Sequence, residues 1–146
     1  MNMKKDFLIK DTASCGEGIF SKRSFKKDAV LFVFGTKIVP WTKANHRSIQ
    51  LEKNRWLNPT EEDLGFFLNH SCHPNARFLA PHFIAALSGI KPGEEITIDY
   101  ASVINITKWD MECGCGSKDC RKIVKSYSQS PERIREKYKG MTSFRA

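Results

Sequence analysis

Turns limit the fold of this chain more than any other feature, because proline and glycine interrupt it repeatedly after residue 39. The interruptions are Pro40, Pro59, Pro74, Pro81 and Lys91-Pro92-Gly93. Proline lacks a backbone N–H and cannot continue a helix or a central strand. The segments between these turns are too short for a helical bundle or a doubly wound sheet. The sequence therefore predicts a mostly β fold made of several small sheets.

The segments between the turns are rich in β-branched and aromatic residues, which favour strands. The expected strands cover residues 7–9, 19–20, 30–34, 49–51, 76–79, 82–87 and 95–100. Helices are expected to be few and short, the first over residues 60–68.

A second helix is expected near the end of the chain. Ser130 can cap it, Pro131 suits its first position, and Gly140 can end it. Ile134 and Tyr138 are four residues apart and would share one face. The helix is therefore expected to pack on the core as a C-terminal clamp.

The chain length of 146 residues suits one domain with one core. The longest apolar run, residues 29–34, is too short to cross a bilayer, and no signal-peptide pattern opens the sequence. We therefore expect a cytoplasmic protein with no membrane contact. The nucleus of a host cell is the other expected location if the protein is delivered there.

The net charge is +8, from 24 Lys and Arg against 16 Asp and Glu. Such a charge allows non-specific contact with nucleic acid. The basic residues are spread along the chain, so a solvated face is favoured over a nucleic-acid-binding stripe.

Three polar motifs stand out, and each is ambiguous alone. Gly16-Glu17-Gly18 lets a turn approach a ligand closely, although a plain hairpin turn is the commoner explanation. Residues 68–75, Leu-Asn-His-Ser-Cys-His-Pro-Asn, place ligand-binding groups in one loop, or else a hydrogen-bonded turn that joins two strands. Residues 93–100, Gly-Glu-Glu-Ile-Thr-Ile-Asp-Tyr, form a strand that ends in a phenol, which a core tyrosine would also explain.

Together and in this order, the three motifs strongly resemble the SET-domain family, over residues 7–124. The family signatures are Gly-x-Gly, Asn-His-Ser-Cys-x-Pro-Asn and Glu-(Leu/Ile)-Thr-x-Asp-Tyr. The resemblance implies small twisted sheets with a C-terminal pseudoknot, in which the last motif passes beneath a loop near the middle one. It also implies transfer of a methyl group from S-adenosylmethionine to the ε-amine of a protein lysine.

The resemblance also assigns residues to this reaction, with Tyr100 as the catalytic residue. Lysine would enter a channel that includes Phe67, Ile98 and Tyr100. The residues expected to hold S-adenosylmethionine are Gly16, Glu17, Gly18, Asn69, His70, Tyr100 and Trp109. Trp109 has an alternative role in core packing.

Methyl transfer requires an aligned and neutral amine, and neutralising lysine at pH 7 costs about 4.6 kcal/mol. An apolar channel and a nearby sulfonium favour the neutral form, so no general base is expected. Family members often carry Phe or Tyr at position 98, where this chain has Ile98. Because Ile offers no hydroxyl, we expect the enzyme to add more than one methyl group.

Three of the five cysteines, Cys113, Cys115 and Cys120, follow a C-x-C-x₄-C spacing, one ligand short of a tetrahedral zinc site. The resemblance completes the site with Cys72 and implies one structural Zn²⁺. A redox-active cysteine group is the alternative. Cys15 is expected to be a small buried residue. The implied division is a core over residues 1–110, a post-SET zinc segment over 111–125, and a helix and tail over 126–146.

Two classes of function remain. The favoured one is a protein-lysine methyltransferase whose partner is a histone tail or another basic protein with an accessible lysine. The other is an inactive SET-like module that binds lysine-rich peptides or nucleic acid. The insertion at residues 46–64 is short, so substrate selection rests on few contacts. A basic substrate would need acids along the groove, and the candidates are Glu61, Glu62, Asp63, Glu94 and Glu95.

Overall fold

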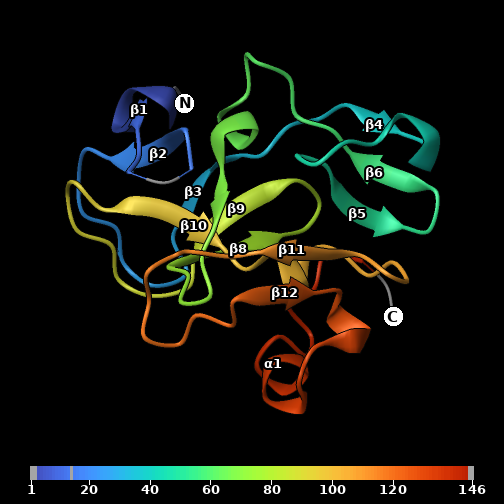
Figure 1. Cartoon of the computed structure of the whole chain (residues 1–146). Coiled ribbons are helices and arrows are strands. Elements are labelled where there is room, and N and C mark those ends of the chain that lie inside the picture. Colours follow the sequence, from blue (N-terminus) through green and yellow to red (C-terminus); the bar gives the residue numbers. More distant parts are fainter. Residues whose placement is uncertain (1–2, 14, 145–146) are drawn as a thin grey trace.

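The computed structural model describes residues 3–13 and 15–144 (Figure 1). Within these residues the strands form four small sheets, which confirms the mostly β prediction. The first sheet has the order β1 (Phe7–Asp11), β2 (Glu17–Ser21), β10 (Glu95–Ile98) and β7 (Asn69–His70). The second is β3 (Val30–Val33), β9 (Phe83–Ala86) and β8 (Ala76–Leu79). The third is β4 (Ile38–Val39), β6 (Arg55–Leu57) and β5 (Ile49–Glu52), and the fourth pairs β11 (Asp110–Glu112) with β12 (Ile123–Lys125).

The helices of the described residues are few and short, as expected. They are α1 (Glu132–Lys137) and the 3₁₀ turns η1 (Met3–Asp6), η2 (Trp41–Lys43), η3 (Leu64–Phe67), η4 (Tyr100–Ser102) and η5 (Tyr127–Gln129). None of the helices in this part of the chain has the length and apolar character needed to cross a bilayer.

Strand β10 brings the three motifs together. It pairs antiparallel with β2, where Ile96 faces Ile19, and parallel with β7, where Ile98 faces His70. The segment of the last motif therefore lies directly against the middle one. Ile19, Ile96 and Ile98 are at most 1% exposed and belong to the main hydrophobic core beneath the sheets.

A smaller hydrophobic cluster attaches the end of the chain to this core. It joins Val124 of β12 and Ile134 of α1 to Cys72, Ala101 and Tyr138. In Figure 1, β12 and α1 lie below β11, on the side away from the third sheet. Ile134 and Tyr138 are both buried, which confirms that they share the packed face of the helix.

Two expected elements are shorter than the sequence suggested. The helix over residues 60–68 is reduced to η3, because the carboxylate of Asp63 accepts hydrogen bonds from the N–H and the hydroxyl of Thr60 and so holds residues 60–63 in a turn. The strand over residues 95–100 ends at Ile98, because the carboxylate of Asp99 accepts a hydrogen bond from the N–H of Ala101 and caps η4. Tyr100 therefore stands in a turn.

The C-terminal helix begins later than expected. Pro131 is its N-cap and Glu132 its first residue. Ser130 does not cap it, because its hydroxyl donates instead to the carbonyl oxygens of Lys125 and Ser126. Gly140 follows the helix with φ of +80°, the left-handed conformation that suits a helix end.

Candidate active site

Asn69 links the first and last motifs. Its side-chain amide donates to the carbonyl oxygen of Glu17 at 3.0 Å and to the carboxylate of Glu95 at 2.9 Å. Gly18 makes this packing feasible: a Cβ there would lie 2.5 Å from Oε2 of Glu95 and 3.1 Å from Nδ2 of Asn69. Gly18 thus leaves room for the side chains of Asn69 and Glu95 to form this hydrogen bond.

The turn before Gly18 is exposed. Gly16 has φ of +72° and no atom close to where a Cβ would stand. Cys15 is exposed, so the expectation that it is a buried residue was wrong. Its backbone N–H donates to the hydroxyl of Thr12 at 2.8 Å.

Tyr100 is fixed at both ends. Its backbone N–H donates to Nδ1 of His70 at 2.9 Å, and its phenol donates to the carbonyl oxygen of Leu68 at 2.8 Å. Burial raises the pKa of Tyr100 above its ordinary value. The phenol is therefore protonated at physiological pH, and its oxygen lone pairs can accept a hydrogen bond from an amine.

His70 is a neutral support for Tyr100. Burial lowers the pKa of His70 to about 4, although Asp99 acts in the opposite direction. Because Nδ1 accepts from Tyr100, the ring proton lies on Nε2, which is 3.4 Å from the sulfur of Cys72. His70 therefore connects Tyr100 to the cysteine cluster.

Two cavities border Tyr100. The larger has a volume of about 430 Å³ and the smaller about 230 Å³. Both are lined by Cys15, His46, Asn69 and Tyr100. The larger adds His70, Trp109, Asp110, Met111, Glu112, Cys113, Gly114 and Cys115, and the smaller adds Gly16, Glu17, Arg47, Phe66, Phe67 and Leu68. Tyr100 thus stands where two ligand-sized spaces meet.

A narrow cleft also ends at Tyr100. Its volume is about 10 Å³, room for about one water-sized group. Six of its lining residues are apolar, and the others are His46, Arg47, Ser48 and Tyr100; the apolar ones are Phe34, Ile49, Leu68, Ile98, Val103 and Ile104. Ile98 therefore lies beside Tyr100, within reach of a group bound there.

Two residues at these cavities were missed by sequence reasoning. His46 lines both cavities and the cleft. Arg47 lies over the ring of Phe66 at 3.7 Å and donates from Nε to the carbonyl oxygen of Phe66 at 2.9 Å. Neither residue belongs to a recognisable motif, so no signal in the sequence marked them.

The acids at the larger cavity are Asp110 and Glu112 of β11, which were not among the acids that the sequence analysis considered for a basic substrate.

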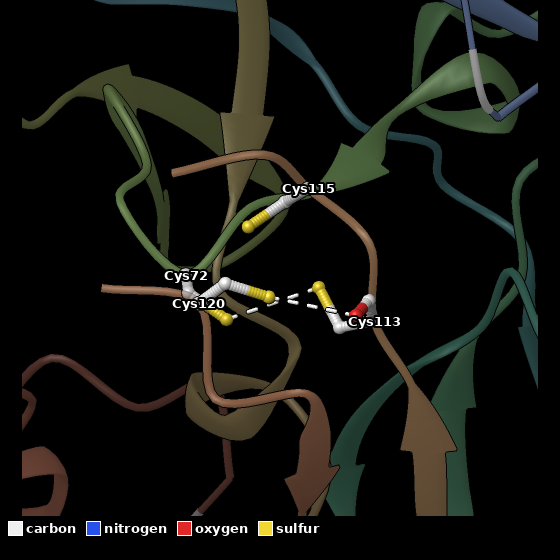
Figure 2. Close-up of side chains that lie close together, drawn as sticks. All are labelled: Cys72, Cys113, Cys115 and Cys120. Carbon is white, nitrogen blue, oxygen red and sulfur yellow. Dashed lines mark hydrogen bonds between the residues drawn. The ribbon is translucent and has the colours of Figure 1, made fainter. Parts of the chain in front are cut away.

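The four cysteines predicted to bind metal come together (Figure 2). Cys72 follows β7, and the others, Cys113, Cys115 and Cys120, lie in the loop between β11 and β12. Their sulfur atoms all lie within 4.8 Å of one another, and those of Cys72 and Cys113 are 3.8 Å apart.

This geometry fits zinc. Zn–S bonds of about 2.3 Å place the sulfurs of a tetrahedral site about 3.8 Å apart. The N–H of Arg121 points at the sulfur of Cys72 at 3.4 Å, as expected for a ligating thiolate. The four thiols would hold one Zn²⁺ and tie the β11–β12 loop, which walls the larger cavity, to the core.

A buried polar network beneath Tyr100 was also missed. Asp99 accepts from Arg121 at 2.6 Å, from the hydroxyl of Tyr138 at 3.0 Å and from the N–H of Ala101 at 3.0 Å. The side chains of Arg121 and Asp99 are 6% and 0% exposed. The network therefore joins the residue before Tyr100 to the cysteine loop and to the C-terminal end of α1.

Comparisons with known proteins agree with the resemblance. The SET domain family matches residues 16–101. A histone-lysine N-methyltransferase of Fusarium mangiferae, H3 lysine-9 specific KMT1, is 32% identical over 124 residues, which cover 69% of this chain and 34% of that protein. Human histone-lysine N-methyltransferase 2B is 38% identical over 65 residues, 40% of this chain and 2% of that protein.

A solved structure shares the fold. The crystal structure of KRYPTONITE in complex with mCHG DNA and SAH superimposes with a TM-score of 0.65 at 22% identity, and the match covers 82% of this chain and 29% of that one. The chain thus spans well under half the length of these relatives. Because the family match covers more than half of the sequence, the chain belongs to the SET-domain family.

Proposed function

We propose that this chain is an S-adenosylmethionine-dependent protein-lysine N-methyltransferase that acts on a histone or another protein. The observation that carries the proposal is the position of Tyr100, fixed by two hydrogen bonds where two cavities and an apolar cleft meet. Relatives named histone-lysine N-methyltransferases support the same reaction. A cytoplasmic location and the division at residues 110 and 125 belong to this proposal.

The larger cavity and the glycine turn suit the methyl donor. A cavity of about 430 Å³ falls within the usual range for small-molecule sites. Asn69, His70 and Trp109 line it, and Asn69 also borders the smaller cavity next to Gly16 and Glu17. Arg47, in the smaller cavity, offers a guanidinium to the carboxylate of the donor.

The cleft suits the lysine amine. Ile98 and Leu68 surround its end with apolar surface, which disfavours a charged ammonium. The phenol oxygen of Tyr100 already donates its proton to Leu68, so its free lone pairs can accept from the amine and direct the nitrogen lone pair toward the methyl group. Catalysis then rests on alignment of the reacting atoms, with Tyr100 as the aligning group.

Replacing Tyr100 by Phe tests the proposal. We expect Tyr100→Phe to lower kcat/KM about a hundredfold while the affinity for the donor stays unchanged, because the phenol oxygen aligns the amine and the ring remains. The zinc-loaded protein would be incubated with labelled S-adenosylmethionine and core histones, peptides or cell lysate, and methyl-lysine read by mass spectrometry. Donor affinity would be measured by calorimetry.

Tyr127→Phe is the matched control, because the Tyr127 hydroxyl donates to the carbonyl oxygen of Arg135, away from the cavities. It should retain full activity. Equal activity of the Tyr100→Phe protein would remove Tyr100 from the mechanism. A folded protein that does not bind the donor would refute the methyltransferase proposal and favour the binding module.

The product is expected to depend on Ile98. The wild-type protein should add more than one methyl group, because the side chain of Ile98 offers no hydroxyl that would hold a water beside the amine. Ile98→Tyr should fill the cleft and shift the product mainly to monomethyl-lysine. Intact-mass analysis of a peptide product over time would measure the distribution, and Ile98→Leu should keep the wild-type pattern. Monomethylation by the wild-type protein would contradict the expectation.

A further inference from the structure

A third cavity, of about 240 Å³, lies beside the proposed active site. It is lined by Trp41, Trp56 and Trp109, which are all the tryptophans of the chain, together with Ile104 and Ile106. None of its lining residues is Asp, Glu, Lys or Arg. The cavity thus suits an uncharged, apolar guest.

Trp41 forms an exposed but ordered rim for this cavity. Its side chain is 50% exposed, although large aromatic residues are usually more buried than that. Its ring lies 5.2 Å from the ring of Trp56, which is 2% exposed, and its backbone N–H donates to the side-chain oxygen of Asn54 at 2.9 Å. An exposed tryptophan held in place over a hollow is the kind of residue that dominates binding at interfaces.

The cavity is continuous with the groups around Tyr100. Trp109 and His46 line both it and the larger cavity. His46, Ser48 and Ile104 also line the cleft that ends at Tyr100. Because the cleft and this cavity share a wall, a polypeptide that places its lysine in the cleft can place a neighbouring side chain among the three tryptophans.

We propose that this cavity, the tryptophan pocket, binds a large apolar side chain that flanks the target lysine in the protein substrate. The inference rests on the proposed function, because the lysine at Tyr100 is what brings the neighbouring residues here. An extended chain advances about 3.3 Å per residue and turns alternate side chains to the same face, so the guest lies within about three residues of the lysine. The tryptophan pocket selects substrates by an aromatic or aliphatic neighbour of that lysine.

Intrinsic fluorescence tests this directly, because every tryptophan of the chain lines the pocket. The zinc-loaded full chain would be titrated with peptides that carry one lysine and either Phe or Ala at each flanking position. We expect one Phe position to shift the emission and to bind at least about tenfold more tightly than its Ala counterpart. The same peptide should show the higher kcat/KM in the methylation assay.

Trp41→Ala should weaken binding of the preferred Phe peptide about tenfold and leave binding of the Ala peptide and of S-adenosylmethionine unchanged. Because Trp41 is half exposed, this change should not unfold the protein. Ile38→Ala is the matched control: Ile38 is 47% exposed on β4, which pairs with the strand of Trp56, but it does not line the cavity. It should leave every affinity unchanged.

The experiments can refute the tryptophan pocket and the proposed function independently of each other. Equal binding of Phe and Ala peptides, or an equal loss in the Ile38→Ala and Trp41→Ala proteins, would overturn the pocket even if lysine is methylated. A Phe peptide that binds and depends on Trp41, in a protein that methylates nothing, would support the pocket and refute the methyltransferase.

Discussion

Removal of zinc is expected to abolish methyl transfer and to lower the melting temperature by about 10 °C. The four thiols come from the core and from the β11–β12 loop, so a bound ion would join the two, in addition to the Arg121–Asp99 pair. A metal held at about a thousand times its dissociation constant stabilises the folded state by about 4 kcal/mol. For a chain of this size, 1 kcal/mol shifts the melting temperature by roughly 2–4 °C. Because Cys113, Gly114 and Cys115 wall the larger cavity, donor binding should be lost as well.

Elemental analysis, thermal unfolding and donor affinity, each before and after chelation, measure this effect. One zinc per chain is expected. Cys113→Ser should lose the ion and behave like the chelated protein, whereas Cys15→Ser should retain the ion, because Cys15 lies outside the cluster. A chelated protein with unchanged melting and donor affinity would show that the cysteines act in another way, such as redox chemistry.

Arg121→Met is expected to destabilise the protein by about 3–5 kcal/mol, because it leaves the carboxylate of Asp99 buried without its cation. The hydrogen bonds from Ala101 and Tyr138 remain but do not replace the charge. The double change Arg121→Met with Asp99→Asn should recover much of the loss, since it removes both charges. The Nε and NH1 atoms of Arg121 are buried with no hydrogen-bond partner, so burying the guanidinium is itself costly.

Urea denaturation would measure these free energies. Arg55→Met is the matched control: it breaks the pair between Arg55 and Glu52, whose side chains are 53% and 45% exposed, and should cost less than about 1 kcal/mol. Tyr138→Phe removes one hydrogen bond to Asp99. Its loss of stability, about 1.5–3 kcal/mol, should lie between those of Arg55→Met and Arg121→Met. If Arg121→Met cost no more than Arg55→Met, the buried pair would not stabilise the fold.

Among the described residues, the sequence predicted the strands of four or five residues and missed those of two or three, which are β4, β6, β7, β11 and β12. Residues 76–79 were assigned correctly as β8, and residues 82–87 contain β9. Strand β7 was missed because its two residues, Asn69 and His70, have side chains typical of a loop, and its pairing with β10 depends on the tertiary fold. Strands β4, β6, β11 and β12 were missed because two or three residues are too few to show the alternation that marks a strand.

The predicted site residues came from motifs, and the remainder depends on contacts between distant segments. Asn69, His70, Tyr100 and Trp109 meet at the larger cavity, where the motifs suggested them. Their roles in catalysis stay predictions. Arg121 reaches Asp99 across 22 positions and Tyr138 reaches it across 39, and no local pattern encodes either contact.

The position of β10 between β2 and β7 has a consequence for synthesis of the chain. Strand β2 ends at Ser21, but its partner β10 begins at Glu95, so the ribosome adds more than seventy residues before that pairing is possible. At a synthesis rate of about 5–20 residues per second, the edge of β2 that later pairs with β10 stays unpaired for roughly 4–15 s. Asp99 lacks two of its hydrogen-bond donors until Arg121 and Tyr138 have also been synthesised. The free edge of β2 is therefore exposed to aggregation until β10 has been made.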